Sequence, residues 1–335
     1  MDKRLMLAVA GSGKTRYIIE NLCLNKRYLV ITYTINNYNT IRNRIISKFG
    51  YLPSNITLYK YFDFLYNFCT KPFTLFKYNV KGIHFELPPT FTLNLKINKR
   101  KRYFTNTNKL YHNRISKFLE ITNIIPKIIH KIEMFYDCII IDEFQDLGGH
   151  DFNFIMQISQ AKINILYVCD FYQNTYVTSF DGNVNSNLFK NYSEYIKRIT
   201  SYNIQVDTKT LLKSYRCPPI ICEFISNQLG VNIESANNNE TNIFILDKDD
   251  NFEHILNDDR IIKLVYSNSK KNLFFSKNWG ECKGEDNYND TCIILTKSAT
   301  KLLQKGKLIE MPNSTKNKLY VALSRTKGNC YIIKQ

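Results

Sequence analysis

The sequence of 335 residues lacks paired metal-binding cysteine motifs and long apolar runs. Its nine cysteines are scattered without a C-x-x-C pair, which argues against a zinc site and favours a reducing compartment. No apolar stretch reaches the ~18 residues of a membrane span, and the N-terminus, Met1-Asp2-Lys3-Arg4, does not resemble a signal peptide. We therefore expect a soluble, cytoplasmic protein without a membrane partner.

Acidic residues are scarce relative to basic ones. There are 29 Asp and Glu against 46 Lys and Arg, which gives a formal net charge of +17. Such a surplus favours a polyanionic partner such as nucleic acid, although a basic surface that only confers solubility is the alternative. A hydrophobic content of 44% excludes a disordered chain, and the length suffices for about two domains.

The first motif lies close to the N-terminus, at residues 8–15 (AVAGSGKT), between an apolar run and a segment of helical periodicity. Glycines at 11 and 13 let backbone N–H groups approach a phosphate, and the start of the helix presents its positive end to the same anion. We expect Lys14 to contact the outer phosphates and Thr15 to hold Mg²⁺. Ala8 replaces the first glycine of the full pattern, so a glycine turn with an exposed lysine is the alternative.

Acidic residues follow a second apolar run. Residues 138–141 (CIII) precede Asp142 and Glu143, and a further strand-like run at 163–168 precedes Gln173. In an ATPase the first acid holds Mg²⁺ and the second orients the attacking water, while Gln173 could bond the γ-phosphate and that water. Each residue alone could cap a helix or occupy a surface turn. Together with the phosphate loop, they indicate ATP hydrolysis.

Strand-like and helical segments alternate through most of the chain, which predicts parallel sheets with right-handed crossovers. One example is the apolar run 28–33, which is followed by an expected polar turn at 34–37 and by helical spacing over 38–49. The alternation stops over about 71–130, which contains the basic cluster 96–102 (KINKRKR). This region is predicted to be an inserted subdomain whose basic cluster either contacts nucleic acid or is a solvated loop. Further strand-like runs from 243 to 333 predict a second parallel sheet.

Taken in order, these motifs resemble those of superfamily 1 helicases of the UvrD, Rep and PcrA type, over residues 5–333. The similar strings are residues 10–15, 32–36 (TYTIN), 57–64, 141–146 (IDEFQD), 170–176, 214–216 (SYR), 281–284 and 320–326 (YVALSRT). The resemblance implies an α/β fold of two RecA-like parallel-sheet P-loop domains in tandem. Domain 1A would comprise 1–54 and 131–205, a small 1B-like subdomain 55–130, and domain 2A 206–335.

The resemblance also assigns roles to residues. It implies that ATP is hydrolysed by five catalytic residues, Lys14, Glu143, Gln173, Arg216 and Arg325. Of these, Arg216 and Arg325 would act as arginine fingers. ATP contacts are implied for Ala10, Gly11, Ser12, Gly13, Lys14, Thr15, Arg16, Tyr215, Glu281 and Gly284. Mg²⁺ would be held by Thr15 and Asp142. Contacts to a single strand are implied for Tyr33, Thr34, Asn36, Thr57 and Tyr176, with Phe180 as a further stacking face.

Three features of these helicases are missing. Too few residues precede residue 10 for an upstream glutamine motif, Val177-Thr178-Ser179 stands where a Trp-Arg pair is usual, and only 63 residues separate Arg216 from Gly280, too few for a large 2B insertion. We expect an ATP-dependent translocase on single-stranded DNA, or RNA, with 3′ to 5′ polarity implied by the resemblance and duplex unwinding left open. It would act as a monomer or transient oligomer with an unknown loading partner. The alternatives are a nucleic-acid-binding ATP switch and a P-loop ATPase that acts on proteins.

Overall fold

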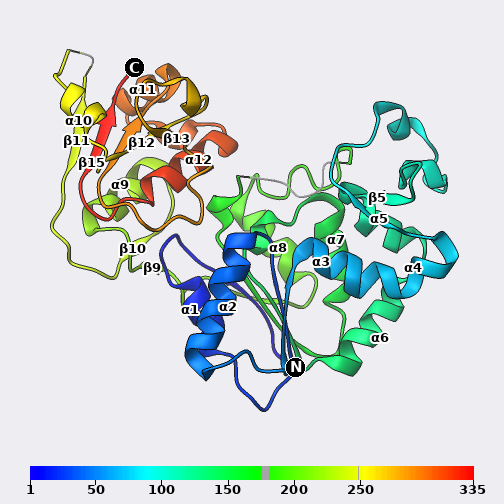
Figure 1. The fold of residues 1–335 in the computed structure, drawn as a ribbon. Helices are drawn as coiled ribbons and strands as arrows, with labels where there is room; N and C mark the ends of the chain where they lie inside the picture. Colours follow the sequence, from blue (N-terminus) through cyan, green and yellow to red (C-terminus); the bar gives the residue numbers. More distant parts are fainter. Residues whose placement is uncertain (176–180, 248) are drawn as a thin grey trace. The chain divides into compact units, whose positions relative to one another are not determined.

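The computed structural model describes residues 1–175, 181–247 and 249–335 (Figure 1). The chain divides into two compact units, both of which are α/β with parallel sheets, as the sequence predicts. Unit 1 comprises Met1–Met6, Thr15–Cys169 and Tyr176–Asp207, and unit 2 comprises Leu7–Lys14, Asp170–Thr175 and Thr208–Gln335. Within the described residues, every helix is too short or too polar to span a membrane.

Unit 1 is built on a six-stranded sheet with the order β3-β2-β6-β7-β1-β8. The strands are β1 (Lys3–Leu7), β2 (Tyr28–Thr32), β3 (Ile56–Lys60), β6 (Cys138–Ile141), β7 (Asn164–Cys169) and β8 (Gln205–Asp207). Strands β2 and β6 are buried along their whole length because helices cover both faces of the sheet. The connecting helices are α1 (Lys14–Glu20), α2 (Ile35–Phe49), α6 (Ile125–Phe135), α7 (Gly149–Ile158) and α8 (Tyr192–Thr200).

Helix α2 begins earlier than its periodicity suggests. The Thr34 hydroxyl accepts a hydrogen bond from the Asn37 N–H at 3.1 Å, which satisfies one of the unpaired donors at the helix start. The polar stretch 34–37, interpreted from sequence as a turn, is therefore the N-cap and first turn of α2. As a result, Thr34 and Asn36 directly follow the carboxyl end of β2.

The segment between β3 and α6 contains short elements. They are α3 (Tyr61–Asp63), a π-helical stretch (Phe64–Thr70), α4 (Lys71–Tyr78), β4 (Gly82–His84), β5 (Lys109–Tyr111) and α5 (Ile115–Ile121). Strands β4 and β5 pair in parallel as a separate two-stranded sheet, and Leu110 of β5 also forms an antiparallel bridge with Phe104. Strand β3 lies in the main sheet although the predicted subdomain starts at 55, and β8 pairs with β1 across the predicted boundary at 205. The domain division therefore stays a prediction.

Unit 2 contains a five-stranded parallel sheet with the order β11-β15-β14-β12-β13. Its strands are β11 (Ile243–Leu246), β12 (Ile262–Val265), β13 (Ser276–Asn278), β14 (Thr291–Ile294) and β15 (Cys330–Ile333). Its helices include α9 (Pro219–Leu229), α11 (Lys297–Gln304) and α12 (Asn313–Leu323). The polar edge strand β13 was not predicted, because it lacks the apolar run that marked the other four.

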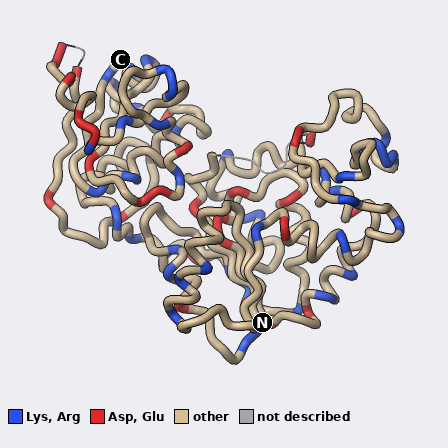
Figure 2. Tube along the Cα trace, viewed as in Figure 1, with Lys and Arg blue, Asp and Glu red and all other residues tan. Residues whose placement is uncertain are grey.

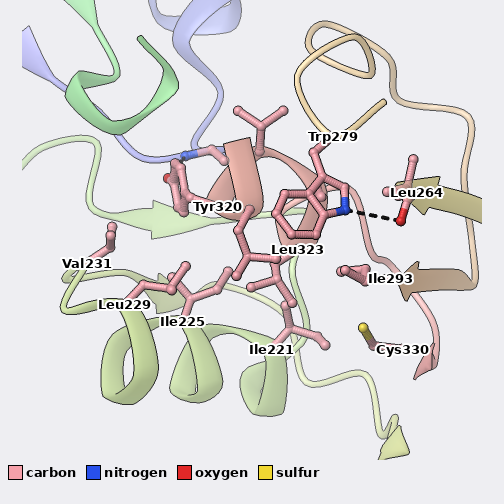
Figure 3. Close-up of a cluster of buried hydrophobic side chains, with 14 of the residues drawn as sticks. Ile221, Ile225, Leu229, Val231, Leu264, Trp279, Ile293, Tyr320, Leu323 and Cys330 are labelled. Carbon is pink, nitrogen blue, oxygen red and sulfur yellow. Dashed lines mark hydrogen bonds between the residues drawn. The ribbon is translucent and has the colours of Figure 1, made fainter. Parts of the chain in front are cut away.

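The core of unit 2 is formed by α9, α12 and one face of the sheet (Figure 3). Ile221, Ile225 and Leu229 lie on successive turns of α9, and all three side chains are fully buried. The Trp279 indole is also fully buried, and its N–H donates to the Leu264 carbonyl at 3.1 Å. Since Trp279 is the only tryptophan of the chain, its fluorescence reports on unit 2 alone.

Truncation of Ile225 to alanine should destabilise unit 2. The change leaves a cavity in a close-packed core, so we expect Ile225→Ala to lower the free energy of unfolding by about 2–5 kcal/mol. Urea titration followed by Trp279 fluorescence measures this loss. Leu273→Ala is the control, since Leu273 is fully exposed and should stay within about 0.5 kcal/mol of the wild type. Equal losses in the two variants would contradict the assigned core.

Candidate active site

The glycine-containing loop lies in unit 2, at Leu7–Lys14. Gly11 and Gly13 adopt φ angles of 73° and 83°, in the left-handed region that favours glycine. The Gly11 carbonyl accepts a hydrogen bond from the Tyr215 N–H at 2.9 Å. A Cβ atom on Gly11 would lie 2.6 Å from Ser214 Oγ and 2.7 Å from Arg216 Cβ. Only glycine therefore lets the loop approach residues 214–216 this closely.

Tyr320, on α12, connects the loop to the segment after β7. Its hydroxyl accepts a hydrogen bond from the Ala10 N–H at 2.8 Å and donates one to Asp170 Oδ2 at 3.2 Å. Burial raises the pKa of Tyr320 well above its usual value, so the hydroxyl keeps its proton. Asp170 also accepts from the Tyr172 N–H at 3.2 Å and caps the short turn that carries the buried Gln173.

Two arginines predicted as catalytic are largely buried in the same unit. Arg216 Nη1 donates to the Ser324 carbonyl at 3.2 Å, and the guanidinium forms an ion pair with Asp286. Arg325 donates to the carbonyls of Val321 and Glu285, at 3.2 and 3.0 Å. Burial and the positive charge of Arg325 lower the pKa of Arg216. Two such close cations are suited to binding an anion with several negative charges.

The buried polar atoms of unit 2 that have no hydrogen-bond partner among the described residues include one in the loop and one on an arginine. These two atoms are Ser12 Oγ and Arg216 Nε. A buried donor without a partner carries an energetic cost of about 1–3 kcal/mol, which a bound phosphate oxygen would remove. The loop, the arginines and these two atoms therefore fit a nucleoside triphosphate.

The acidic pair lies in unit 1, at the carboxyl end of β6. Asp142 is 3% exposed, its N–H donates to the Ile31 carbonyl at 2.9 Å, and its Oδ1 accepts from the Glu143 N–H at 3.0 Å. Glu143 has a φ of 53°, which is uncommon for a residue other than glycine, and its carboxylate accepts from the Gln145 side chain. The hydroxyl of Thr32, at the end of the adjacent strand, is buried without a partner among the described residues. A buried carboxylate beside an unsatisfied hydroxyl fits a hydrated Mg²⁺.

The sequence over residues 104–334 matches the viral superfamily 1 RNA helicase core domain. The chain belongs to this helicase family. The match confirms the superfamily predicted from the ordered motifs, while the UvrD, Rep and PcrA type stays a prediction. No curated protein matches the chain.

Solved helicase structures resemble the fold. The arterivirus nonstructural protein 10 helicase in complex with DNA aligns with a TM-score of 0.53 and 11% identity, over 99% of this chain and 61% of that one. A second structure of the arterivirus helicase aligns with a TM-score of 0.48 and 11% identity, over 99% of this chain and 59% of that one. The chain thus spans less than two thirds of the helicases it resembles. At this identity the first likeness shows the fold alone, which is that of tandem RecA-like domains.

The four remaining predicted ATP contacts of this helicase core are exposed to solvent. Tyr215 is 67% exposed, as a ring that stacks on a base must be. Arg16 is exposed and forms an ion pair with Glu20 at 2.7 Å, one turn along α1. Glu281 and Gly284 are exposed in the turn that follows Trp279. These four positions carry no buried unsatisfied group, so their roles stay predictions.

The predicted strand contacts of the helicase core fall into three groups. Tyr33, Thr34 and Asn36 lie together beyond the carboxyl end of β2. Thr57 does not lie beside them, because the pairing of β2 with β3 places it opposite Leu29 and places Lys60 at the strand end. Tyr176 and Phe180 lie outside the described residues. Tyr320 was missed among the site residues, although it begins the string 320–326 that carried the resemblance.

Replacing Gly11 by alanine should impair nucleotide binding. The added methyl group meets Ser214 and Arg216 below 3.0 Å, so the loop must shift, and we expect the affinity for ATP to fall. Gly306→Ala is a matched control: its φ is 65°, but a Cβ there meets nothing within 4 Å. Titration with a fluorescent ATP analogue compares the two. Unchanged binding in Gly11→Ala would exclude this loop as the phosphate site.

Replacing Tyr320 by phenylalanine should lower the free energy of unfolding of unit 2, because it removes a hydrogen bond that holds the loop. The change leaves the buried Ala10 N–H without its acceptor, and we expect a loss of about 1–3 kcal/mol in unfolding free energy. Urea unfolding followed by Trp279 fluorescence measures it. Tyr331→Phe is the control, since no hydrogen bond of that hydroxyl joins it to the loop and its ring is partly exposed. A neutral effect of Tyr320→Phe would show that the two hydrogen bonds contribute nothing to stability.

Proposed function

We propose that the chain is the motor core of an enzyme that hydrolyses ATP, with Mg²⁺, to move along single-stranded nucleic acid. Membership of the superfamily 1 helicase family supports a helicase or translocase. The observation that carries the proposal is the approach of Gly11 to Ser214 and Arg216, which brings a phosphate-binding loop next to a buried cation. The predicted domains, 1A, a 1B-like subdomain and 2A, remain part of this proposal.

The proposed chemistry assigns each group a task. Lys14 and the loop amides bind the phosphates, and Arg216 with Arg325 stabilises the negative charge that develops on the γ-phosphate. Glu143 and Gln173 orient the attacking water, and Glu143 accepts its proton. Thr15 and Asp142 would hold Mg²⁺, which when bound offsets phosphate charge.

The proposed nucleic-acid contacts are Tyr33, Thr34 and Asn36. The matching family is described as an RNA helicase core, and the arterivirus neighbour is complexed with DNA, so both polymers are candidate substrates. The resemblance to UvrD-type enzymes makes DNA and movement from 3′ to 5′ the first combination to test. Duplexes with a single-stranded tail at either end decide the direction of movement.

Loss of either arginine should nearly abolish turnover. An arginine that stabilises the phosphoryl-transfer transition state contributes about 10³- to 10⁵-fold to kcat, so Arg216→Ala and Arg325→Ala should each lose that factor. The matched control is Arg260→Ala, because Arg260 is exposed and its ion pair within the described part of the chain is with Asp258, two residues away. A phosphate-release assay measures the rates. Wild-type kcat in Arg325→Ala would remove that residue from the proposed mechanism.

Single-stranded polymers should raise the ATPase rate of the wild-type chain, and Glu143→Gln should bind ATP without turning it over. Release of phosphate is measured with poly(dT), with poly(U) and without polymer. A rate that neither polymer changes would refute the translocase. If a cell that carries Glu143→Gln behaved like one with the wild type, ATP binding without hydrolysis would suffice, and the chain would be an ATP-binding switch instead.

A further inference from the structure

An aromatic cluster in unit 1 extends from the end of β2 into the segment 55–130. We propose that Phe85, supported by His112 and Phe62, is a stacking platform for an unpaired base of the bound strand. We refer to these three residues as the Phe85 platform. The inference rests on the proposed function, since it adds a contact for the same single strand.

The geometry of the Phe85 platform leaves one large ring exposed and fixed. Phe85 directly follows β4 and is 62% exposed. Its ring stacks on the His112 imidazole with centroids 5.8 Å apart and an angle of 23°. Phe62 meets the same ring edge-on, at 5.3 Å and 90°. An exposed ring that two neighbours hold in place loses less conformational entropy when it binds a partner.

The cluster is continuous with the predicted strand contacts. The Phe62 ring lies 6.0 Å from that of Tyr33, which follows β2 and precedes Thr34 and Asn36. A series of rings therefore runs from Tyr33 through Phe62 to Phe85. Successive bases of a single strand stack on such rings with little dependence on sequence.

His112 serves the platform as a flat, uncharged ring. Its Nδ1 lies 3.3 Å from the His84 carbonyl, and burial lowers the pKa of His112 below its usual value. Phe62 also meets this imidazole, with centroids 5.8 Å apart at 77°. The ring is thus held on two sides and stays neutral at pH 7.

The charge around the platform matches a polyanion. Residues 55–130 contain 13 Lys and Arg against 3 Asp and Glu, so this segment carries ten of the seventeen surplus positive charges of the chain. Blue predominates over red along it in Figure 2. Lys81 and Lys109, which precede β4 and begin β5, are both exposed. Two acidic residues adjoin the platform in sequence: Glu86 follows Phe85, with a side chain that is 88% exposed, and Asp63 follows Phe62 and forms an ion pair with Lys60.

Binding of fluorescein-labelled dT and U oligonucleotides, measured by anisotropy over a salt series, tests the platform. Phe85→Ala should weaken binding about 5- to 150-fold, the range for loss of one stacked base. Its salt slope should stay unchanged, because Phe85 neutralises no phosphate. Lys81→Ala should instead reduce the slope by about 0.7. Glu86→Gln should strengthen binding.

Two variants control for unfolding and for general hydrophobicity. Phe85→Tyr keeps a stacking ring and should retain wild-type affinity. Phe91→Ala removes a ring of similar exposure, 60%, in the same segment, and should leave the affinity unchanged. A third variant, Phe85→Trp, serves as a binding probe. It adds a second tryptophan to the chain, whose only other tryptophan, Trp279, is buried, and the emission of the new tryptophan should be quenched when an oligonucleotide binds.

The outcomes separate this inference from the proposed function. If the wild type binds neither oligonucleotide, the proposed function fails. If the wild type binds and Phe85→Ala binds equally well, the platform alone is overturned. A Phe85→Trp signal that responds to vesicles containing phosphatidylserine but not to oligonucleotides would also overturn it, in favour of a membrane surface.

Discussion

The Tyr320 hydroxyl determines how the glycine-containing loop, Leu7–Lys14, is attached to the rest of unit 2. Its two hydrogen bonds, to the Ala10 N–H and to the Asp170 carboxylate, join segments that are 310 and 150 residues away in sequence. Both bonds are buried, where the low local dielectric strengthens them and makes their loss costly. With Ala10 held, Gly11 can lie against Ser214 and Arg216, and the turn that carries Gln173 is capped by the same carboxylate.

The two largely buried arginines are oriented mainly by backbone carbonyls. Arg325 donates to the carbonyls of Val321 and Glu285, and Arg216 donates to that of Ser324. Carbonyl dipoles fix a guanidinium but leave its full positive charge, whereas a buried carboxylate would cancel it. The one carboxylate on Arg216 belongs to Asp286, which is largely exposed and screened by water. Charge is therefore kept available for an incoming anion, at the cost of repulsion between Arg216 and Arg325.

Features that depend on neighbouring residues were predictable from sequence, and those that depend on distant partners were not. The loop at 8–15, the acids after β6 and the parallel strands follow from local apolar periodicity. The role of Tyr320 depends on partners far away along the chain, so no local pattern could reveal it. The place of Thr57 near the start of β3 was not predictable, because a motif string gives no strand register, and the pairing with β2 puts Lys60 at the carboxyl end of the strand. The first turn of α2 was missed because Thr34 and the asparagines after it are typical of turns as well as of helix caps.

The segment 55–130 combines two kinds of contact that cannot substitute for each other. Its lysines attract phosphates, which single strands and duplexes both present, so charge alone gives affinity without selecting the form of the polymer. A duplex hides the faces of its bases within the stack, while an unpaired base leaves them accessible. An exposed ring such as Phe85 therefore stacks on an unpaired base without first having to unstack a duplex. Phe85 lies in this basic segment and is joined through Phe62 to Tyr33, so a strand bound as we propose would meet both the positive charge and the rings.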